Sequence, residues 1–276
     1  MRIDIVSLFP EFFDAFFSHS IIKRAIEAER LSMGVTNPRD FSHNKHGQVD
    51  DTPYGGGAGM LMMAPPIFEA VESVITQYDS EINSAYSTDE MCDEMSLIGN
   101  PSESIRRRVI FMGPTGQPFT QEKARELATY DQLVLICGHY EGVDYRVEEY
   151  LVDETISIGD YVLTGGELPA MVVADAVSRM IPGVLGAVSG AQEDSFYEPL
   201  LECPQYTKPP EFRGWGVPDV LRSGHHKNIA TWRQKEALKR TRLLRPDLLE
   251  RPLTKEEIKL LKEIIAEESE RDIGEV

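Results

Sequence analysis

The fold of this chain is limited most by four short apolar runs, each followed by a segment with helical spacing. The runs are rich in β-branched residues and cover residues 3–9, 107–113, 132–138 and 154–159. Strands that alternate with helices form a mainly parallel sheet covered by helices, because a parallel neighbour is reached only through a crossover connection. The alternation therefore predicts the α/β class with a parallel sheet.

Helix boundaries are signalled by proline and by capping residues. Pro10 opens a helix that we expect to continue without a break to about residue 31. Thr120 is the expected N-cap of a second helix, and Thr254 begins a capping box with Glu257. Helical patterns at residues 228–244 and 254–270 complete a helical C-terminal part.

Three of the four predicted strands end in glycine, at Gly113, Gly138 and Gly159. Ligands of parallel sheets bind outside the carboxyl ends of the strands, so the three turns are expected to form one site. None of the turns fits GxxxxGK[ST] or GxGxxG, and residues 157–170 contain no Lys or Arg. The alternative is three tight turns whose glycines only supply a positive φ.

The residue types in these turns favour a ligand without phosphate. Backbone groups can read an adenine edge, and carboxylates suit ribose hydroxyls or a positively charged group. S-adenosylmethionine combines adenine, ribose, a sulfonium and an ammonium group. We therefore interpret the three turns as a site for S-adenosylmethionine.

Charge is distributed unevenly along the chain. The net charge of −18 argues against nucleic acid as a partner, but residues 205–245 hold ten Lys and Arg against three acids. Phosphate contacts are local, so this segment could bind a polyanion; the alternative is a solvated basic helix. The cations expected to contact phosphates are Lys235, Lys239, Arg240 and Arg242.

Composition also predicts the compartment. The chain has three cysteines, Cys92, Cys137 and Cys203, too far apart in sequence for a metal motif or a disulfide framework. A reducing cytoplasm is the expected location, and with no run of about 18 apolar residues no membrane span is predicted. We also predict no metal cage from the sequence.

Composition shifts divide the chain into two domains. Residues 1–186 form the predicted α/β domain, and the polar, acidic residues 77–105 form a surface insertion that is partly disordered. Residues 187–199 are a Gly- and Ser-containing linker, and residues 200–276 form a small α-helical domain.

Four longer stretches closely resemble the bacterial tRNA (guanine-N1)-methyltransferase family, a SPOUT-class family. They are "DDTPYGGGAGMLM", "EDSF", "LLECPQYTKP" and the segment from "CGHYEGVDYRV" through "SIGDYVLTGGELPA" to "IPGVLG". The resemblance covers nearly the whole chain except residues 77–105. The chain departs from the family at Ala58, where we expect a small effect, and at His139 and Tyr145, where the family's backbone contacts carry over and its side-chain contacts do not.

The resemblance implies a function and an assembly. It implies methylation of N1 of the guanine at position 37 of tRNA, with S-adenosylmethionine as methyl donor and Mg²⁺ required. It further implies a deep trefoil knot in the first domain, a tRNA-binding second domain and a cytoplasmic homodimer with active sites at the subunit interface. Two rival hypotheses are an RNA-binding protein without catalysis and a methyltransferase for another base or for rRNA.

The resemblance also assigns residues to the site. Asp194 would be the general base that removes the N1 proton, and Arg179 would stabilise charge that develops on O6. Without the resemblance, Arg179 could equally pair with Asp175 one helical turn away, and Asp194 could be a cap or a loop acid. The donor-binding residues are implied to be Pro114, Gly138, Tyr140, Glu141, Ile158, Gly159, Asp160, Tyr161, Val162, Leu163, Gly165, Gly166 and Pro169.

Overall fold

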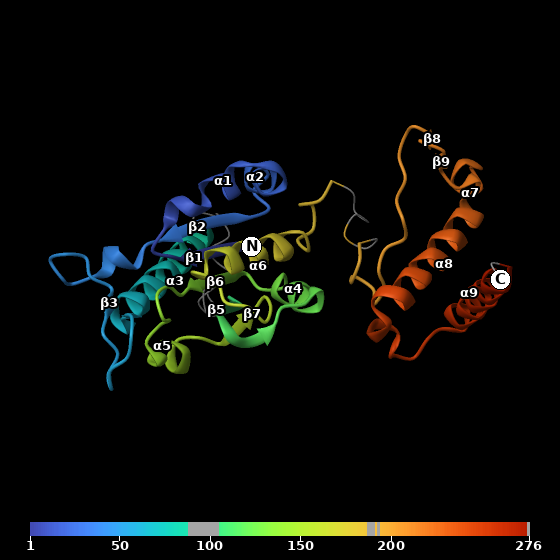
Figure 1. Cartoon of the computed structure of the whole chain (residues 1–276). Helices are drawn as coiled ribbons and strands as arrows, with labels where there is room; N and C mark the ends of the chain where they lie inside the picture. Colours follow the sequence, from blue (N-terminus) through green and yellow to red (C-terminus); the bar gives the residue numbers. More distant parts are fainter. Residues whose placement is uncertain (88–104, 187–190, 192–193, 275–276) are drawn as a thin grey trace. The chain divides into compact units, whose positions relative to one another are not determined.

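The computed structural model describes residues 1–87, 105–186, 191 and 194–274. Over these residues the chain divides into two compact units, Met1–Val188 and Ser189–Val276, drawn in Figure 1 from blue to yellow and from orange to red. The division falls inside the predicted linker. Each unit has its own core and is described by itself.

A parallel sheet forms the centre of the first unit, as predicted. Its order is β2-β1-β6-β5-β7 over the described residues, and every pairing between neighbours is parallel. The strands are β1 (Arg2–Val6), β2 (Ser32–Thr36), β5 (Arg107–Pro118), β6 (Gln132–Cys137) and β7 (Glu154–Ser157). The edge strand β2 was not predicted, because its five residues include glycine and one exposed serine and lack an apolar run.

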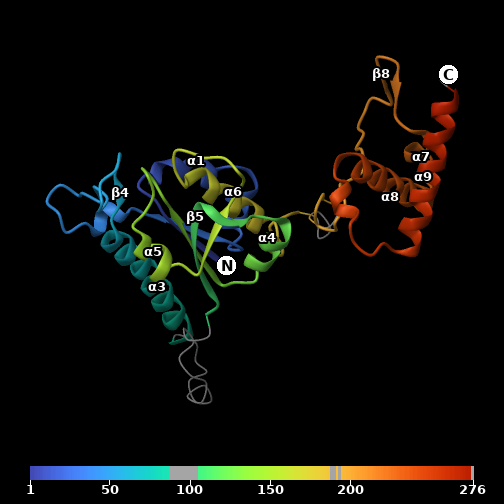
Figure 2. The same ribbon diagram turned by 60° about the horizontal axis from the view of Figure 1, so that its bottom comes forward.

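Helices cover both faces of the sheet, and side chains alternate between the two layers. From the central strand β6, Leu133 and Leu135 enter one core with α2 (Ser20–Glu27), α4 (Gln121–Leu127) and α6 (Glu167–Ser178). Val134 and Ile136 enter the opposite core with α3 (Ala64–Ser87) and α5 (Tyr145–Tyr150). Figure 2 shows α3 and α5 together, separated from α6 by the sheet.

The helix expected from Pro10 to residue 31 is broken, so that prediction was wrong. The segment forms η1 (Pro10–Phe13), α1 (Asp14–Ser18) and α2. His19 is extended and Ser20 has a φ of 54°, which interrupts the helical hydrogen bonds between α1 and α2. Apolar spacing alone did not reveal this break because apolar residues of both helices, Phe16 and Phe17 of α1 and Ile22 and Ala25 of α2, pack in or against one core.

The acidic insertion was also predicted too early in the chain. Residues 77–87 continue α3 instead of forming irregular structure. Arg107 pairs with Asp79, and Arg2 reaches Glu81 at 2.7 Å between Nη1 and Oε2, so these acids hold the helix to the sheet. The remainder of the predicted insertion, residues 88–104, lies outside the described residues.

The second unit is built on two long helices, α8 (His226–Leu244) and α9 (Lys255–Gly274). Leu238 packs between Leu260 and Ile264 in its small core. The predicted capping box is confirmed, since Thr254 and Glu257 exchange side chain to backbone hydrogen bonds of 2.7 and 3.2 Å. The unit also contains α7 (Asp219–Arg222), η5 (Pro246–Leu249) and a hairpin of β8 (Glu211–Phe212) with β9 (Trp215–Gly216).

Three small elements complete the first unit: η2 (Pro38–Phe41) and the antiparallel pair β3 (Asp50–Asp51) and β4 (Leu61–Met62). In the part of the chain that the structure describes, no helix is both long and apolar enough to cross a bilayer.

Candidate functional site

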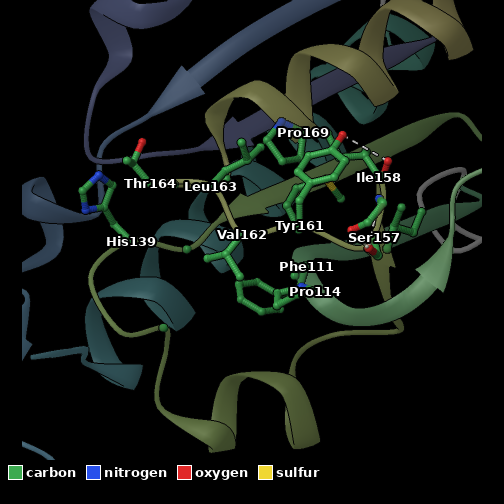
Figure 3. A pocket seen from close by; sticks show the side chains of 18 of the residues that line it. Phe111, Pro114, His139, Ser157, Ile158, Tyr161, Val162, Leu163, Thr164 and Pro169 are labelled. Carbon is green, nitrogen blue, oxygen red and sulfur yellow. Dashed lines mark hydrogen bonds between the residues drawn. The ribbon is translucent and has the colours of Figure 1, made fainter. Parts of the chain in front are cut away.

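The three glycine segments meet in one pocket (Figure 3), at the carboxyl ends of β6 and β7 and beside the middle of β5. The strand expected to end at Gly113 continues to Pro118, so Gly113 and Pro114 line the pocket from within β5, where its register with β7 shifts. The turn after β6 contributes residues 138–142, and the longer segment before α6 contributes most of residues 158–166. The structure therefore brings together segments that lie up to about fifty residues apart along the chain.

Gly166 has a backbone position that only glycine can occupy. Its N–H donates to the carbonyl oxygen of Gly138 at 2.9 Å. A Cβ on Gly166 would lie 2.6 Å from the Cα of Cys137, a contact with backbone that no side-chain movement relieves. The segment after β7 is thus pressed against the end of β6, and this contact closes the pocket.

Gly165 is constrained by side chains instead of backbone. A Cβ there would lie 2.3 Å from Oε2 of Glu167 and 2.8 Å from Cδ2 of His139. The bare Cα of Gly165 thus leaves space for these two side chains. A larger residue at this position would therefore displace the pocket wall before it reached a ligand.

Aromatic and aliphatic side chains line the pocket. Phe111 lies beneath the turns, where a Cβ on Gly138 would approach its ring to 3.0 Å. The hydroxyl of Tyr161 donates to the carbonyl oxygen of Ile158 at 3.3 Å, and Figure 3 shows this hydrogen bond as a dashed line beside Pro169. Gly159, with a φ of 151°, lies directly against this ring, as a Cβ would come within 2.5 Å of it. The walls therefore suit a flat, mostly apolar ligand.

Charge in the pocket is negative. Glu141 is the one carboxylate among its lining residues, and these residues include no Lys or Arg. Beside the pocket Glu167 is buried, and its Oε1 accepts a hydrogen bond of 2.8 Å from the Ser7 hydroxyl. Burial, followed by the charge of Glu167, raises the pKa of the Cys137 thiol well above its usual range. A thiol held protonated is a poor nucleophile, so this cysteine is structural.

The glycine-rich loop at residues 53–60 is tied to the same pocket. The N–H of Glu141 donates to the carbonyl of Met60 at 3.1 Å, and the N–H of Met62 donates to the carbonyl of Gly142 at 2.9 Å. A Cβ on Gly59 would lie 2.4 Å from Cγ of Glu141. The loop backbone thus packs directly against the carboxylate side chain of the pocket.

All but one of the predicted donor-binding residues line this pocket. The exception is Asp160, which is not among the lining residues. Eight lining residues were not among the predicted donor-binding residues: Phe111, Met112, Gly113, His139, Gly142, Ile156, Ser157 and Thr164. Four of these lie in the apolar runs of strands β5 and β7, where the sequence interpretation placed core and not site, and the other four lie in or beside the glycine segments that it had already singled out.

The two candidate catalytic residues belong to different units. Arg179 is the C-cap residue of α6 in the first unit, and its N–H donates to the carbonyl of Asp175 at 3.1 Å. Asp194 belongs to the second unit and lines a hollow there with Glu202, Cys203 and other residues near the start of α8.

The basic residues of α8 fall into two groups. Lys235 pairs with Glu267 of α9 at 2.6 Å between Nζ and Oε1, and Arg242 pairs with Glu268. Arg233 and Arg240 lie seven residues apart, on one side of α8, and both lower the pKa of Cys203, which burial raises. Lys235 and Arg242 therefore form ion pairs with glutamates of α9, whereas among the described residues Arg233 and Arg240 form none with α9.

Among the described residues no group of three or more His, Cys, Asp or Glu side chains is arranged to hold a metal ion.

Comparison with known proteins matches residues 1–251 to a family model described as tRNA (Guanine-1)-methyltransferase TrmD. The chain is 53% identical over 265 residues to a tRNA (guanine-N(1)-)-methyltransferase of Desulforamulus reducens, covering 96% of this chain and 95% of the relative. Proteins of the same name from Dehalococcoides mccartyi strain CBDB1 and Brevibacillus brevis are 51% and 54% identical. The match to the Dehalococcoides mccartyi protein covers 98% of this chain and 99% of the relative. The match to the Brevibacillus brevis protein covers 96% of this chain and 98% of the relative.

Proposed function

The chain belongs to the tRNA (guanine-1)-methyltransferase family, and on this basis we propose that it methylates N1 of the guanine at position 37 of tRNA with S-adenosylmethionine as donor. Family and relatives together make it an enzyme, a tRNA (guanine-N1)-methyltransferase. The hypothesis of an RNA-binding protein without catalysis is therefore set aside.

The pocket of the three glycine turns is the observation that carries the donor assignment. Its flat apolar walls fit an adenine, and Glu141 fits ribose hydroxyls or the ammonium group. A phosphorylated cofactor would need cations, and the lining residues supply none. S-adenosylmethionine, when bound, supplies an activated methyl group on a sulfonium.

Methyl transfer to guanine N1 requires that its proton be removed. A carboxylate within hydrogen-bond reach of N1 can accept this proton, and we propose Asp194 for this role. Negative charge then spreads to O6 of the purine, where the guanidinium of Arg179 would stabilise it. Both assignments rest on the family resemblance and on the residue chemistry.

We further propose that Asp194 and Arg179 of one site come from two chains of a homodimer. Arg179 belongs to the first unit and Asp194 to the second, so the proposal does not require the two residues to meet within one chain. In this proposal residues 1–186 bind the donor, residues 187–199 carry the base and residues 200–276 bind tRNA.

Three family properties complete the proposal. We propose a trefoil knot in the first unit on the family resemblance alone. Mg²⁺ would assist the reaction, with Glu141 or Asp194 as loose ligands. A cytoplasmic location is proposed from the tRNA substrate and from the three widely spaced cysteines.

The base assignment is tested by Asp194→Asn, which keeps the side-chain shape and cannot accept the proton. Methylation of a tRNA transcript should slow by about 10²–10⁴-fold while tRNA binding and donor binding persist. Glu198→Gln is the matched control, because Glu198 lines the same hollow of the second unit. Full activity of Asp194→Asn would remove Asp194 as the base.

The shared site is tested by mixing two inactive variants. Arg179→Ala and Asp194→Asn should each be inactive alone, and heterodimers of the two should regain one intact site if the residues act across chains. If native mass spectrometry shows subunit exchange and the mixture stays inactive, the shared-site proposal is wrong. Nucleoside mass spectrometry of the product tRNA identifies the methylated base.

A further inference from the structure

The β8–β9 hairpin of the second unit presents two aromatic rings side by side. Phe212 and Trp215 are direct cross-strand partners, so their side chains leave the same face of the ribbon. Their ring centroids lie 6.4 Å apart with an interplanar angle of 48°. Arg213 and Gly214 form the two-residue turn, and both have positive φ, as the tight turns of such hairpins require.

Both rings are open to solvent. Phe212 is 56% exposed and Trp215 is 70% exposed, although each is large and apolar. A singly exposed apolar side chain needs no explanation, but a pair of adjacent exposed rings on a short, tightly turned ribbon does. The rings make no contribution to the core of the unit, which is formed around Leu238.

The turn between the rings holds a cation. The φ of 55° at Arg213 is the one that the two-residue turn requires. Its guanidinium lies over the Phe212 ring, 5.1 Å from the centroid. The hairpin therefore presents a positive charge next to its two exposed rings.

The segment that carries the hairpin, residues 208–227, has a net positive charge in an otherwise acidic protein. It holds four cations, Lys208, Arg213, Arg222 and Lys227, against Glu211 and Asp219. Asp219 pairs with Arg222, and within the described residues the other three cations form no ion pair. By contrast, α9 carries the acids Glu263, Glu267 and Glu268, which already neutralise cations of α8. An anionic partner with flat apolar groups complements the hairpin, and RNA has both features.

We propose that the β8–β9 hairpin is a base-stacking site for an unpaired nucleobase of the tRNA substrate. Phe212 and Trp215 supply the stacking faces, and Arg213 lies where it can contact an adjacent phosphate or stack on a base. The inference rests on the proposed function, since tRNA is the occupant. It adds an anchoring contact that is separate from the pocket and from Asp194.

Stacking predicts a loss of affinity that does not depend on salt. The variant Phe212→Ala with Trp215→Ala should bind tRNA about tenfold to a hundredfold more weakly. Its plot of log affinity against log salt should keep the wild-type slope, because no phosphate contact is removed. The ring-preserving variant Phe212→Tyr with Trp215→Phe should bind within about twofold of wild type.

Matched controls separate stacking from a general loss of apolar surface. Ile265 is 47% exposed on the acidic helix α9, so Ile265→Ala should leave tRNA affinity unchanged. If the wild-type enzyme binds and methylates tRNA and the double alanine variant binds it with equal affinity, the hairpin inference is wrong and the proposed function stands. Failure of the wild type to bind tRNA would instead overturn the proposed function.

Fluorescence provides a second readout that survives poor folding of the double variant. The chain has two tryptophans, Trp215 and Trp232. In Trp232→Phe the remaining emission reports on Trp215 alone, and saturating tRNA should quench it through ring stacking. Unchanged emission with bound tRNA overturns the inference. The inference is also overturned if the double variant keeps its RNA affinity but changes its oligomeric mass, because the hairpin would then be a contact between chains.

Discussion

Two matched pairs of cations on α8 should respond differently to tRNA. Arg233 and Arg240 lie on the side of the helix near Cys203, whereas Lys235 and Arg242 already pair with glutamates of α9. A cation held by a glutamate neutralises that carboxylate and releases few counterions when RNA binds. We therefore expect the double variant Arg233→Gln with Arg240→Gln to bind RNA more weakly and with a lower salt dependence. The double variant Lys235→Gln with Arg242→Gln should keep nearly the wild-type salt dependence.

The size of this difference follows from counterion release. Each phosphate contact contributes roughly 0.7–0.9 to the slope of log affinity against log salt. Two lost contacts lower the slope by about 1.4–1.8, so between 50 and 200 mM salt the wild type should lose about sevenfold to twelvefold more affinity than the arginine variant. For the pair bound to α9 the slope should change by less than about 0.5.

The assay is a binding titration of labelled tRNA at four or more salt concentrations, with the same RNA for all three proteins. Both double variants remove two positive charges from one helix, so a general effect of net charge would lower both slopes equally. Equal slopes for the two variants would refute the reasoning that ion pairs with α9 withdraw cations from the RNA surface. A larger effect from the pair bound to α9 would reverse the assignment of the two helix sides.

Two further predictions concern stability and the pocket. The side-chain hydrogen bond from Arg251, with those of Thr254, lowers the pKa of Glu257 from 4.5 to about 2, so its contribution is fully present above pH 4.5 and is lost as the pH falls towards 2. The free energy of unfolding of wild type should exceed that of Glu257→Gln by about 3 kcal/mol near pH 6, and this difference should be about 2 kcal/mol smaller near pH 3. Denaturant titrations at the two pH values measure it, and a difference that does not change with pH would contradict the prediction. Gly166→Ala places a Cβ 2.6 Å from the Cα of Cys137. This variant should lower the free energy of unfolding by about 1–3 kcal/mol and should also bind the methyl donor more weakly. The control Gly186→Ala meets nothing within 4 Å, and equal calorimetric behaviour of the two variants would show that the contact at Gly166 relaxes freely.

Local patterns of the sequence were sufficient for much of the first unit. Apolar runs that end in glycine indicated three neighbouring strands, and the shared edge of a parallel sheet brought their turns together. The capping box at Thr254 and Glu257 was equally readable, because its hydrogen bonds join residues three positions apart. Features that depend on a few consecutive residues are encoded where they occur.

Contacts between distant segments were not readable in the same way. Nothing in the spacing of α8 separates Lys235 and Arg242 from the other cations, because their partners lie on α9, 26–32 residues further along the chain. Part of the space beside Gly165 is taken by His139, which lies 26 residues earlier in the chain, and no local pattern shows this. The break at Ser20 was hidden because apolar residues on both sides of it pack in or against one core.

What the sequence by itself determined is thus the strand, turn and cap pattern, together with the residues that can line a phosphate-free pocket. The tertiary structure decided which cations of α8 pair with glutamates of α9. It also decided that Gly166 meets backbone whereas Gly165 meets side chains, and that Phe212 and Trp215 are exposed next to each other. The physical reason is that periodicity and capping act over one or two turns of chain. Charge pairing and exposure are set by how packed elements cross, and this depends on the whole core of each unit.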